Sequence, residues 1–152
     1  MQSTIIPQSS KDAIALIIEA GAKAASPQDF YRMCLDSIAE SMQASFATLE
    51  VQHGASLVRL DNGKNRTRAE FWRGPLDELA EDCISDGAAT SKLYKGRRTG
   101  VTIGLFAVPI DGGAGSLSLV TACANELSEI RLRDRLENLA TMVSLTSVGL
   151  QQ

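Results

Sequence analysis

Three cysteines are the most reactive side chains in this chain, and they lie far apart at Cys34, Cys83 and Cys123. An odd number without paired Cys-x-x-Cys spacing predicts neither a disulfide framework nor a zinc site, and it favours a reducing compartment. A thiolate at Cys83 or Cys123 could serve as a nucleophile, and these two residues could approach each other. Buried free cysteine is nevertheless a common core residue. We therefore prefer structural packing for all three and keep thiol catalysis as an alternative.

His53 is the only histidine, and His53-Gly54 is predicted to form a turn. One histidine cannot build a metal site with cysteines this scattered, so no metal site is predicted. A hydrolase triad is excluded unless His53 is its base. We expect a solvated turn residue, with an acid–base or haem role as the alternative.

Basic residues are concentrated in the middle of the chain, where nine of the fifteen lysines and arginines lie between Arg59 and Arg98. If the Asn62-Gly63 turn and the loop that contains Arg97 lie close together, these side chains form an electropositive rim. The planar guanidinium group of arginine can donate two parallel hydrogen bonds to a phosphate or a carboxylate, so Arg97 and Arg98 are candidate ligand-binding residues. Acidic residues in the same segment favour a salt-bridged surface instead.

Arg131 and Asp134 form an Arg-x-x-Asp pattern that some cyclic di-GMP sites contain. In a helix, residues three apart are neighbours on one face. We therefore prefer a surface ion pair between Arg131 and Asp134 and keep a nucleotide site as the alternative.

Composition indicates one globular domain with no general affinity for polyanions. The 152 residues are 44% hydrophobic and only 5% aromatic, with a net charge of −3. Few aromatics and a negative charge argue against nucleic acid and anionic membranes as partners. No apolar run reaches the length of a bilayer span, and the first residues do not resemble a secretion signal. We expect a flexible lead-in over residues 1–10, a single domain over residues 11–152, and a cytoplasmic protein.

Two apolar strands around a glycine-rich turn are the segment on which the rest of the chain must pack. Thr102–Ile110 and Ser116–Cys123 flank the turn DGGAG, and the second strand alternates serine with leucine. Four more strands are predicted before them, with Asp61-Asn62-Gly63 as a hairpin turn. These are Phe46–Gln52, Ser56–Leu60, Thr67–Trp72 and Ser91–Tyr94.

Helical spacing is predicted in four segments. Apolar residues at intervals of three and four indicate amphipathic helices, with Ser26-Pro27 and Asn125 at the start of two of them. The segments are Ala13–Ala25, Gln28–Met42, Leu76–Ile84 and Glu126–Leu150. The order predicts an α+β fold with an antiparallel sheet of about six strands. The N- and C-terminal helices should pack on one face, and Gly74–Gly100 should cover the other face as the roof of a pocket.

The arrangement Val108-Pro109-Ile110, a short turn, then Gly115-Ser116-Leu117-Ser118-Leu119 and a long helix resembles a GAF domain. The helix that ends at Asp86-Gly87 is also similar to a short helix of that family. The resemblance implies a sensory or regulatory module that binds a small molecule or mediates dimerisation, and that is often joined to other domains. The Asn-Lys signature of nucleotide-binding members and the Cys-His dipeptide of bilin-binding members are absent, so the ligand or cofactor is left open.

Our preferred interpretation is a non-catalytic regulatory module that forms a homodimer through its terminal helices. The alternative for those helices is that they cover each other within one chain. A small ligand would lie between the sheet and the Gly74–Gly100 segment. The candidate lining residues are Phe71, Leu93, Tyr94 and Phe106. The alternatives are a thiol-dependent reductase of the free-methionine sulfoxide reductase type and a structural adaptor without a ligand.

Overall fold

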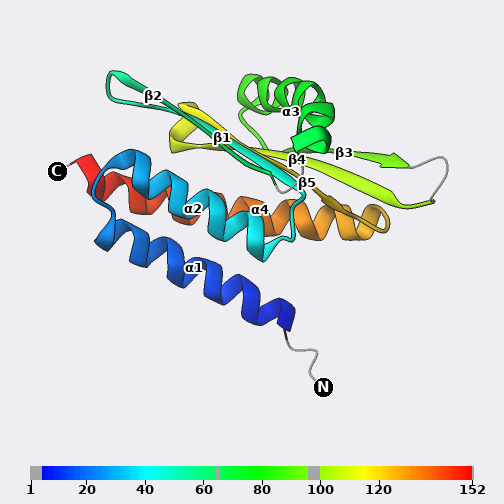
Figure 1. Cartoon of the computed structure of the whole chain (residues 1–152), viewed down its shortest axis with the longest axis horizontal. Coiled ribbons are helices and arrows are strands. Elements are labelled where there is room, and N and C mark those ends of the chain that lie inside the picture. Colours follow the sequence, from blue (N-terminus) through cyan, green and yellow to red (C-terminus); the bar gives the residue numbers. More distant parts are fainter. Residues whose placement is uncertain (1–4, 64–65, 96–99, 152) are drawn as a thin grey trace.

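A five-stranded antiparallel sheet with helices on both faces forms the protein in a computed structural model, which describes residues 5–63, 66–95 and 100–151 (Figure 1). The strand order is β2-β1-β5-β4-β3, and all neighbouring strands are antiparallel. The elements are α1 (Ile5–Lys23), α2 (Pro27–Ser41), β1 (Phe46–His53), β2 (Ser56–Gly63), α3 (Arg66–Asp86), β3 (Thr90–Lys95), β4 (Thr102–Ile110), η1 (Asp111–Gly113), β5 (Gly115–Ala122), α4 (Glu126–Ser147) and η2 (Val148–Gln151).

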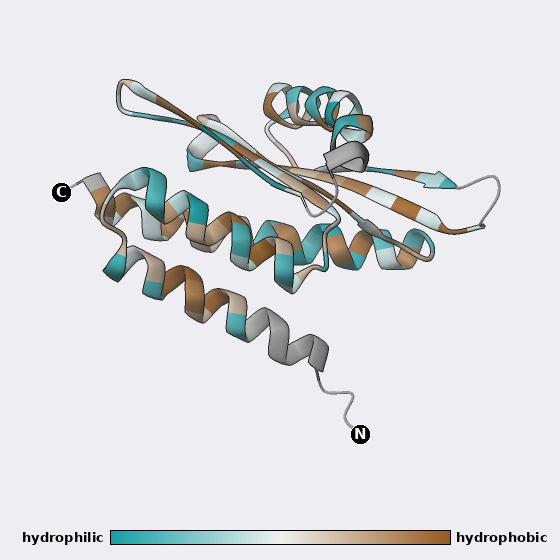
Figure 2. Ribbon diagram, in the orientation of Figure 1, coloured by the Kyte–Doolittle hydropathy of each residue, from teal (hydrophilic) through white to brown (hydrophobic). Residues whose placement is uncertain are grey.

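The central strand β5 lies between β1 and β4 and is buried along nearly its whole length. It follows β4 through the glycine-rich turn, where Gly112 and Gly113 take the positive φ that glycine tolerates best. Hydrophobic residues are frequent in these central strands and in α4 below them (Figure 2). The predicted pair of strands around the DGGAG turn is confirmed.

Three helices cover one face of the sheet in two layers. α2 and α4 lie against the sheet, and α1 packs on both of them from outside (Figure 1). Ile17 of α1, Phe30 of α2 and Val143 of α4 are fully buried in this main core. The predicted packing of the first and last helices together on one side is therefore confirmed.

Local capping explains where the helices begin. The backbone N–H of Asp29 donates to Ser26 Oγ at 3.1 Å at the start of α2, and that of Ser128 donates to Asn125 Oδ1 at 2.9 Å at the start of α4. α1 begins at Ile5 rather than Ala13, so residues 5–10 are helical. Among the described residues, no helix is both long and apolar enough to cross a bilayer.

The opposite face is covered by α3, which corrects one sequence prediction. Thr67–Trp72 was expected to be a strand, but it forms the first turns of this helix. The reason is that Trp72, Leu76, Leu79 and Cys83 recur at helical spacing and pack on the sheet as a second, smaller core. Phe71, which was expected on this strand as a candidate lining residue, is 70% exposed.

The predicted turn at His53-Gly54 is confirmed, because it joins β1 to β2 and Gly54 has a φ of +61°. The second predicted hairpin is wrong. Asp61-Asn62-Gly63 was expected to be a turn, but β2 continues through it, with Gly63 paired to Phe46. The sheet thus has five strands in place of about six, and the next described element after β2 is α3.

Candidate functional site

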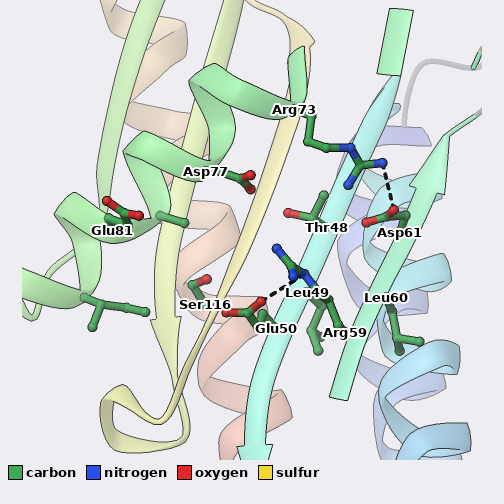
Figure 3. A pocket seen from close by; sticks show the side chains of 12 residues that line it. Thr48, Leu49, Glu50, Arg59, Leu60, Asp61, Arg73, Asp77, Glu81 and Ser116 are labelled. Atoms are coloured by element: carbon green, nitrogen blue, oxygen red, sulfur yellow. Dashed lines mark hydrogen bonds and ion pairs between the residues drawn. The ribbon is translucent and has the colours of Figure 1, made fainter. Parts of the chain in front are cut away.

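A polar hollow of about 160 Å³ lies between the second half of α3 and strands β1, β2 and β5 (Figure 3). α3 crosses above β4 and β5, so the space over β1 and β2 is left partly uncovered. The residues that line it are Thr48, Leu49, Glu50, Arg59, Leu60, Asp61, Arg73, Asp77, Ala80, Glu81, Ile84 and Ser116.

Hydroxyl groups form the floor of this hollow. Side chains alternate along β5, so Leu117 and Leu119 enter the main core while Ser116 and Ser118 face α3. Ser116 lines the hollow and is only 6% exposed, and its hydroxyl has no hydrogen-bond partner among the described residues. The hydroxyl of Ser118, which is paired in register with Thr48, is fully buried and has no partner among the described residues, but Ser118 does not line the hollow. Buried polar groups are usually hydrogen-bonded, so Ser116 has unused bonding capacity at the floor of the hollow.

Two ion pairs stand on the walls of the hollow. Arg59 Nε lies 3.0 Å from Glu50 Oε2, and Arg73 Nη2 lies 2.9 Å from Asp61 Oδ2. The guanidinium of Arg73 also lies 5.3 Å from the centre of the Phe46 ring. The hydrogen bond that Arg73 donates to Asp61 raises the pKa of Arg73 above its usual value. Both arginines therefore already have carboxylate partners.

Two further carboxylates line the hollow without an ion pair to any described residue. They belong to Asp77 and Glu81, which are four residues apart on α3. Asp77 points across the hollow toward Thr48 (Figure 3). Acceptor groups therefore remain available on the α3 wall, opposite the hydroxyl floor.

A second, apolar hollow of about 300 Å³ lies near the beginning of α3, beside strands β3 and β4. The ring of Trp72 lies edge-on to Phe71 at 4.9 Å and to Tyr94 at 5.6 Å between centroids. Lys95, Pro75 and Ile103 complete the lining.

Solved structures that match this chain over almost its whole length are mostly GAF domains. The GAF domain of A. aeolicus nlh2 has a TM-score of 0.71 at 11% identity, over 97% of this chain and 99% of that one. The GAF domain of Acinetobacter phosphoenolpyruvate-protein phosphotransferase has a TM-score of 0.59 at 12% identity, over 99% and 96%. The chain has a GAF fold.

Another match is CepR2 of Burkholderia cenocepacia, with a TM-score of 0.56 at 9% identity, over 95% of this chain and 98% of that one. No family model and no curated protein sequence matches the chain. At these identities the likeness concerns the fold, so the chemistry of the site has to be read from this chain's own side chains.

The GAF fold divides the predicted lining residues between the two faces of the sheet. Phe71 and Tyr94 meet in the apolar hollow beside α3. Leu93 and Phe106 point to the other face, where both pack in the main core. Arg97 and Arg98 lie outside the described residues. The structure thus brings only Phe71 and Tyr94 together.

The thiols also lie on different sides of this GAF fold. Cys34 and Cys123 belong to the main core and Cys83 to the smaller one, so the sheet separates Cys83 from Cys123. All three are buried. Burial raises the pKa of Cys34 to about 12 and that of Cys83 to about 11, and it also raises the pKa of Cys123. Low thiolate content and burial make these thiols poor nucleophiles.

The remaining candidates from the sequence do not converge on one site. Asn62-Gly63 is on β2 and Lys92–Lys95 on β3, at opposite edges of the sheet, so these two segments form no common basic rim. His53 is the last residue of β1 and is half-buried, with its ring 6.1 Å from that of Tyr31. The predicted ion pair between Arg131 and Asp134 is absent, and both residues line a groove between α1 and α4.

Sequence reasoning missed the polar hollow, although two signals for it were present. Serines at positions 116 and 118 are unusual in a strand that is buried on both faces. The spacing of Asp77 and Glu81 places both on one side of a helix. These signals indicate a polar site only when α3 is known to lie above β5, because that position places the serines and the carboxylates on the same side of the sheet.

Proposed function

We propose that this chain is a non-catalytic sensory module whose polar hollow binds a small molecule. The observation that carries the proposal is the hydroxyl of Ser116, a residue that is only 6% exposed, lines the hollow and lacks a hydrogen-bond partner among the described residues. A ligand that hydrogen-bonds to this hydroxyl gains about 0.5–1.5 kcal/mol of binding free energy. Binding would change how α3 packs on the sheet, and a ligand that prefers one packing shifts the population toward it.

The regulatory part of the proposal is supported by the structural neighbours. CepR2 is described as an N-acylhomoserine lactone dependent transcription factor, and another neighbour is a domain of a phosphotransferase. A fold shared with such proteins suits a domain that responds to a small molecule and is joined to an output domain. We place it in the cytoplasm because its three cysteines are all free.

Native mass spectrometry of the protein purified from its own cells tests this proposal. We expect a retained small molecule in the wild type and its loss in Ala80→Met, because a longer side chain at position 80 fills the hollow. Ala22→Met, on the exposed side of α1, is the matched control and should retain the molecule. Retention of the same molecule by Ala80→Met, or an unliganded wild type, would count against the proposal.

Self-association is the second part of the proposal, and exposed apolar side chains on the terminal helices favour it. α1 and α4 cover each other within one chain, yet Leu16 and Ile18 remain 47% and 53% exposed and Leu145 64% exposed. We expect a dimer in light scattering after gel filtration, and a monomer for Leu16→Glu. Leu57→Glu is the control, since Leu57 is 58% exposed and lies on the edge strand β2 rather than on a terminal helix. A monomeric wild type would refute the dimer alone.

The thiol-dependent reductase receives no support from the geometry. Such an enzyme needs an accessible thiol with a lowered pKa, whereas the three thiols here are buried and their pKa values are raised.

A further inference from the structure

We propose that the ligand of the polar hollow is a small organic cation that carries a primary ammonium group. This inference rests on the proposed function and names the class of ligand for the same site. It depends on three features of the hollow: its excess of carboxylates, its unpartnered hydroxyl floor and the separation of its acidic groups.

The charges of the hollow favour a cation. Four carboxylates line it, from Glu50, Asp61, Asp77 and Glu81, against two guanidinium groups. Both guanidinium groups are already engaged, by Glu50 and by Asp61. An anionic ligand would have to displace one of these pairs and would face the two remaining carboxylates. A cation meets the carboxylates of Asp77, which attracts Arg73 only from beyond ion-pair distance, and of Glu81, so it breaks no ion pair.

The hydroxyl floor favours a cation that donates hydrogen bonds. Ser116 is nine-tenths buried, lines the hollow and offers an unpartnered oxygen, and Thr48 lies beside it on β1. An ammonium group has three N–H donors and no acceptor. Asp77 points toward Thr48 across the hollow (Figure 3), so an ammonium group placed between them can donate to the carboxylate and to the Thr48 hydroxyl, with a third N–H left for Ser116. A quaternary amine could satisfy the charge but not the hydroxyl oxygens.

The separation of the carboxylates favours an organic cation over a metal ion. Within the described part of the chain, no three acidic, histidine or cysteine side chains converge closely enough to hold a metal. Divalent cations need several oxygen ligands at about 2.0–2.6 Å around one point. Asp77 and Glu81 instead present carboxylates from neighbouring helical turns, and this spacing suits an extended amine. The volume of about 160 Å³ limits the ligand to a small molecule.

Isothermal titration calorimetry with putrescine tests this inference on the wild type and on matched variants. We expect saturable one-to-one binding that weakens at least tenfold in Asp77→Asn and in Glu81→Gln. The controls are Asp82→Asn and Glu78→Gln, which change the same chemical groups on the exposed side of α3, outside the hollow, and should bind within twofold of wild type. Choline and succinate should bind at least tenfold more weakly than putrescine.

Three results would overturn the inference. They are no binding of putrescine to the wild type, equal weakening in Glu78→Gln and Glu81→Gln, and tighter binding of succinate than of putrescine. If the molecule retained from cells is lost in Ala80→Met but carries no amine, the ligand class is wrong and the proposed function stands. If no molecule is retained and putrescine does not bind, both fail.

Discussion

Arg73 on α3 and Asp61 on β2 are joined by an ion pair of 2.9 Å between Nη2 and Oδ2. The backbone carbonyl of the same Asp61 accepts a hydrogen bond of 2.7 Å from Arg32 of α2, on the opposite side of the sheet. Asn62 adds a bond of 2.8 Å from its side-chain amide to Asp36 of α2. The edge strand β2 is therefore bonded to both helix layers at one point next to the hollow.

Asp61→Asn should lower the free energy of unfolding by about 0.2–1 kcal/mol, because the pair is partly exposed to solvent. Arg73→Gln and the double variant complete a double-mutant cycle, which isolates the coupling energy between Asp61 and Arg73. Urea denaturation monitored by circular dichroism provides the four values. A coupling energy indistinguishable from zero would mean that the pair does not hold α3 to β2.

Tyr31→Phe should destabilise the protein by about 1.5–3 kcal/mol. The hydroxyl of Tyr31 donates to Asp111 Oδ2 at 2.6 Å inside the main core, and Ser147 Oγ donates to Asp111 Oδ1 at 2.8 Å. Removal of the hydroxyl leaves a half-buried carboxylate with one partner fewer. Thermal unfolding measures the loss as a shift of several degrees. Tyr94→Phe, at an exposed position, should shift the midpoint by less than one degree, and equal shifts would contradict the role of this bond.

Leu79→Ala should cost about 2–5 kcal/mol, because Leu79 is buried between α3 and the sheet. Glu78→Ala, the adjacent exposed residue, should change stability by less than about 0.5 kcal/mol. Chemical denaturation gives the free energy of unfolding of both variants for comparison with the wild type. Similar effects at positions 78 and 79 would show that this segment does not pack on the sheet as a helix with one apolar side.

The three thiols should be unreactive toward a thiol reagent at pH 8 in the native state and should all react after unfolding. Burial raises the pKa of Cys34 to about 12 and of Cys83 to about 11, so the folded state keeps these protons while the unfolded state loses them above about pH 9. The unfolded state then binds fewer protons, and stability falls as pH rises from about 9 to 12. Cys34→Val should flatten this fall. Rapid reaction of a native thiol at pH 8 would refute the burial.

Much of the fold followed from local sequence signals. The alternation of Ser116–Val120 with the DGGAG turn predicted the central strands, and Ser26-Pro27 and Asn125 marked two helix starts that capping bonds confirm. The prediction for the segment after β2 was wrong, because a stretch as short as Thr67–Trp72 can be read as the alternating pattern of a strand. Its helical stripe becomes visible only when Trp72 is read together with Leu76 and Cys83.

The candidate site was much less predictable. Phe106 and Leu93 were chosen as aromatic or apolar residues on predicted strands, but a shift of one position along a strand changes the face. Only the register and the position of α3 show that they belong to the main core. The polar hollow combines β1, β2 and α3, which are consecutive elements, with β5, which lies far along the chain, so no local pattern could bring Ser116 and Asp77 together.

Nuclear magnetic resonance of the isotope-labelled protein shows directly whether the hollow under α3 binds a small molecule. The protein is titrated with fractions of a small-molecule extract from its own cells. We predict that one fraction shifts the amide signals of residues 48–50, 77–81 and 116–118, and that Ala80→Met abolishes these shifts. Shifts confined to other surfaces, or no shift with any fraction, would contradict a ligand site in this hollow.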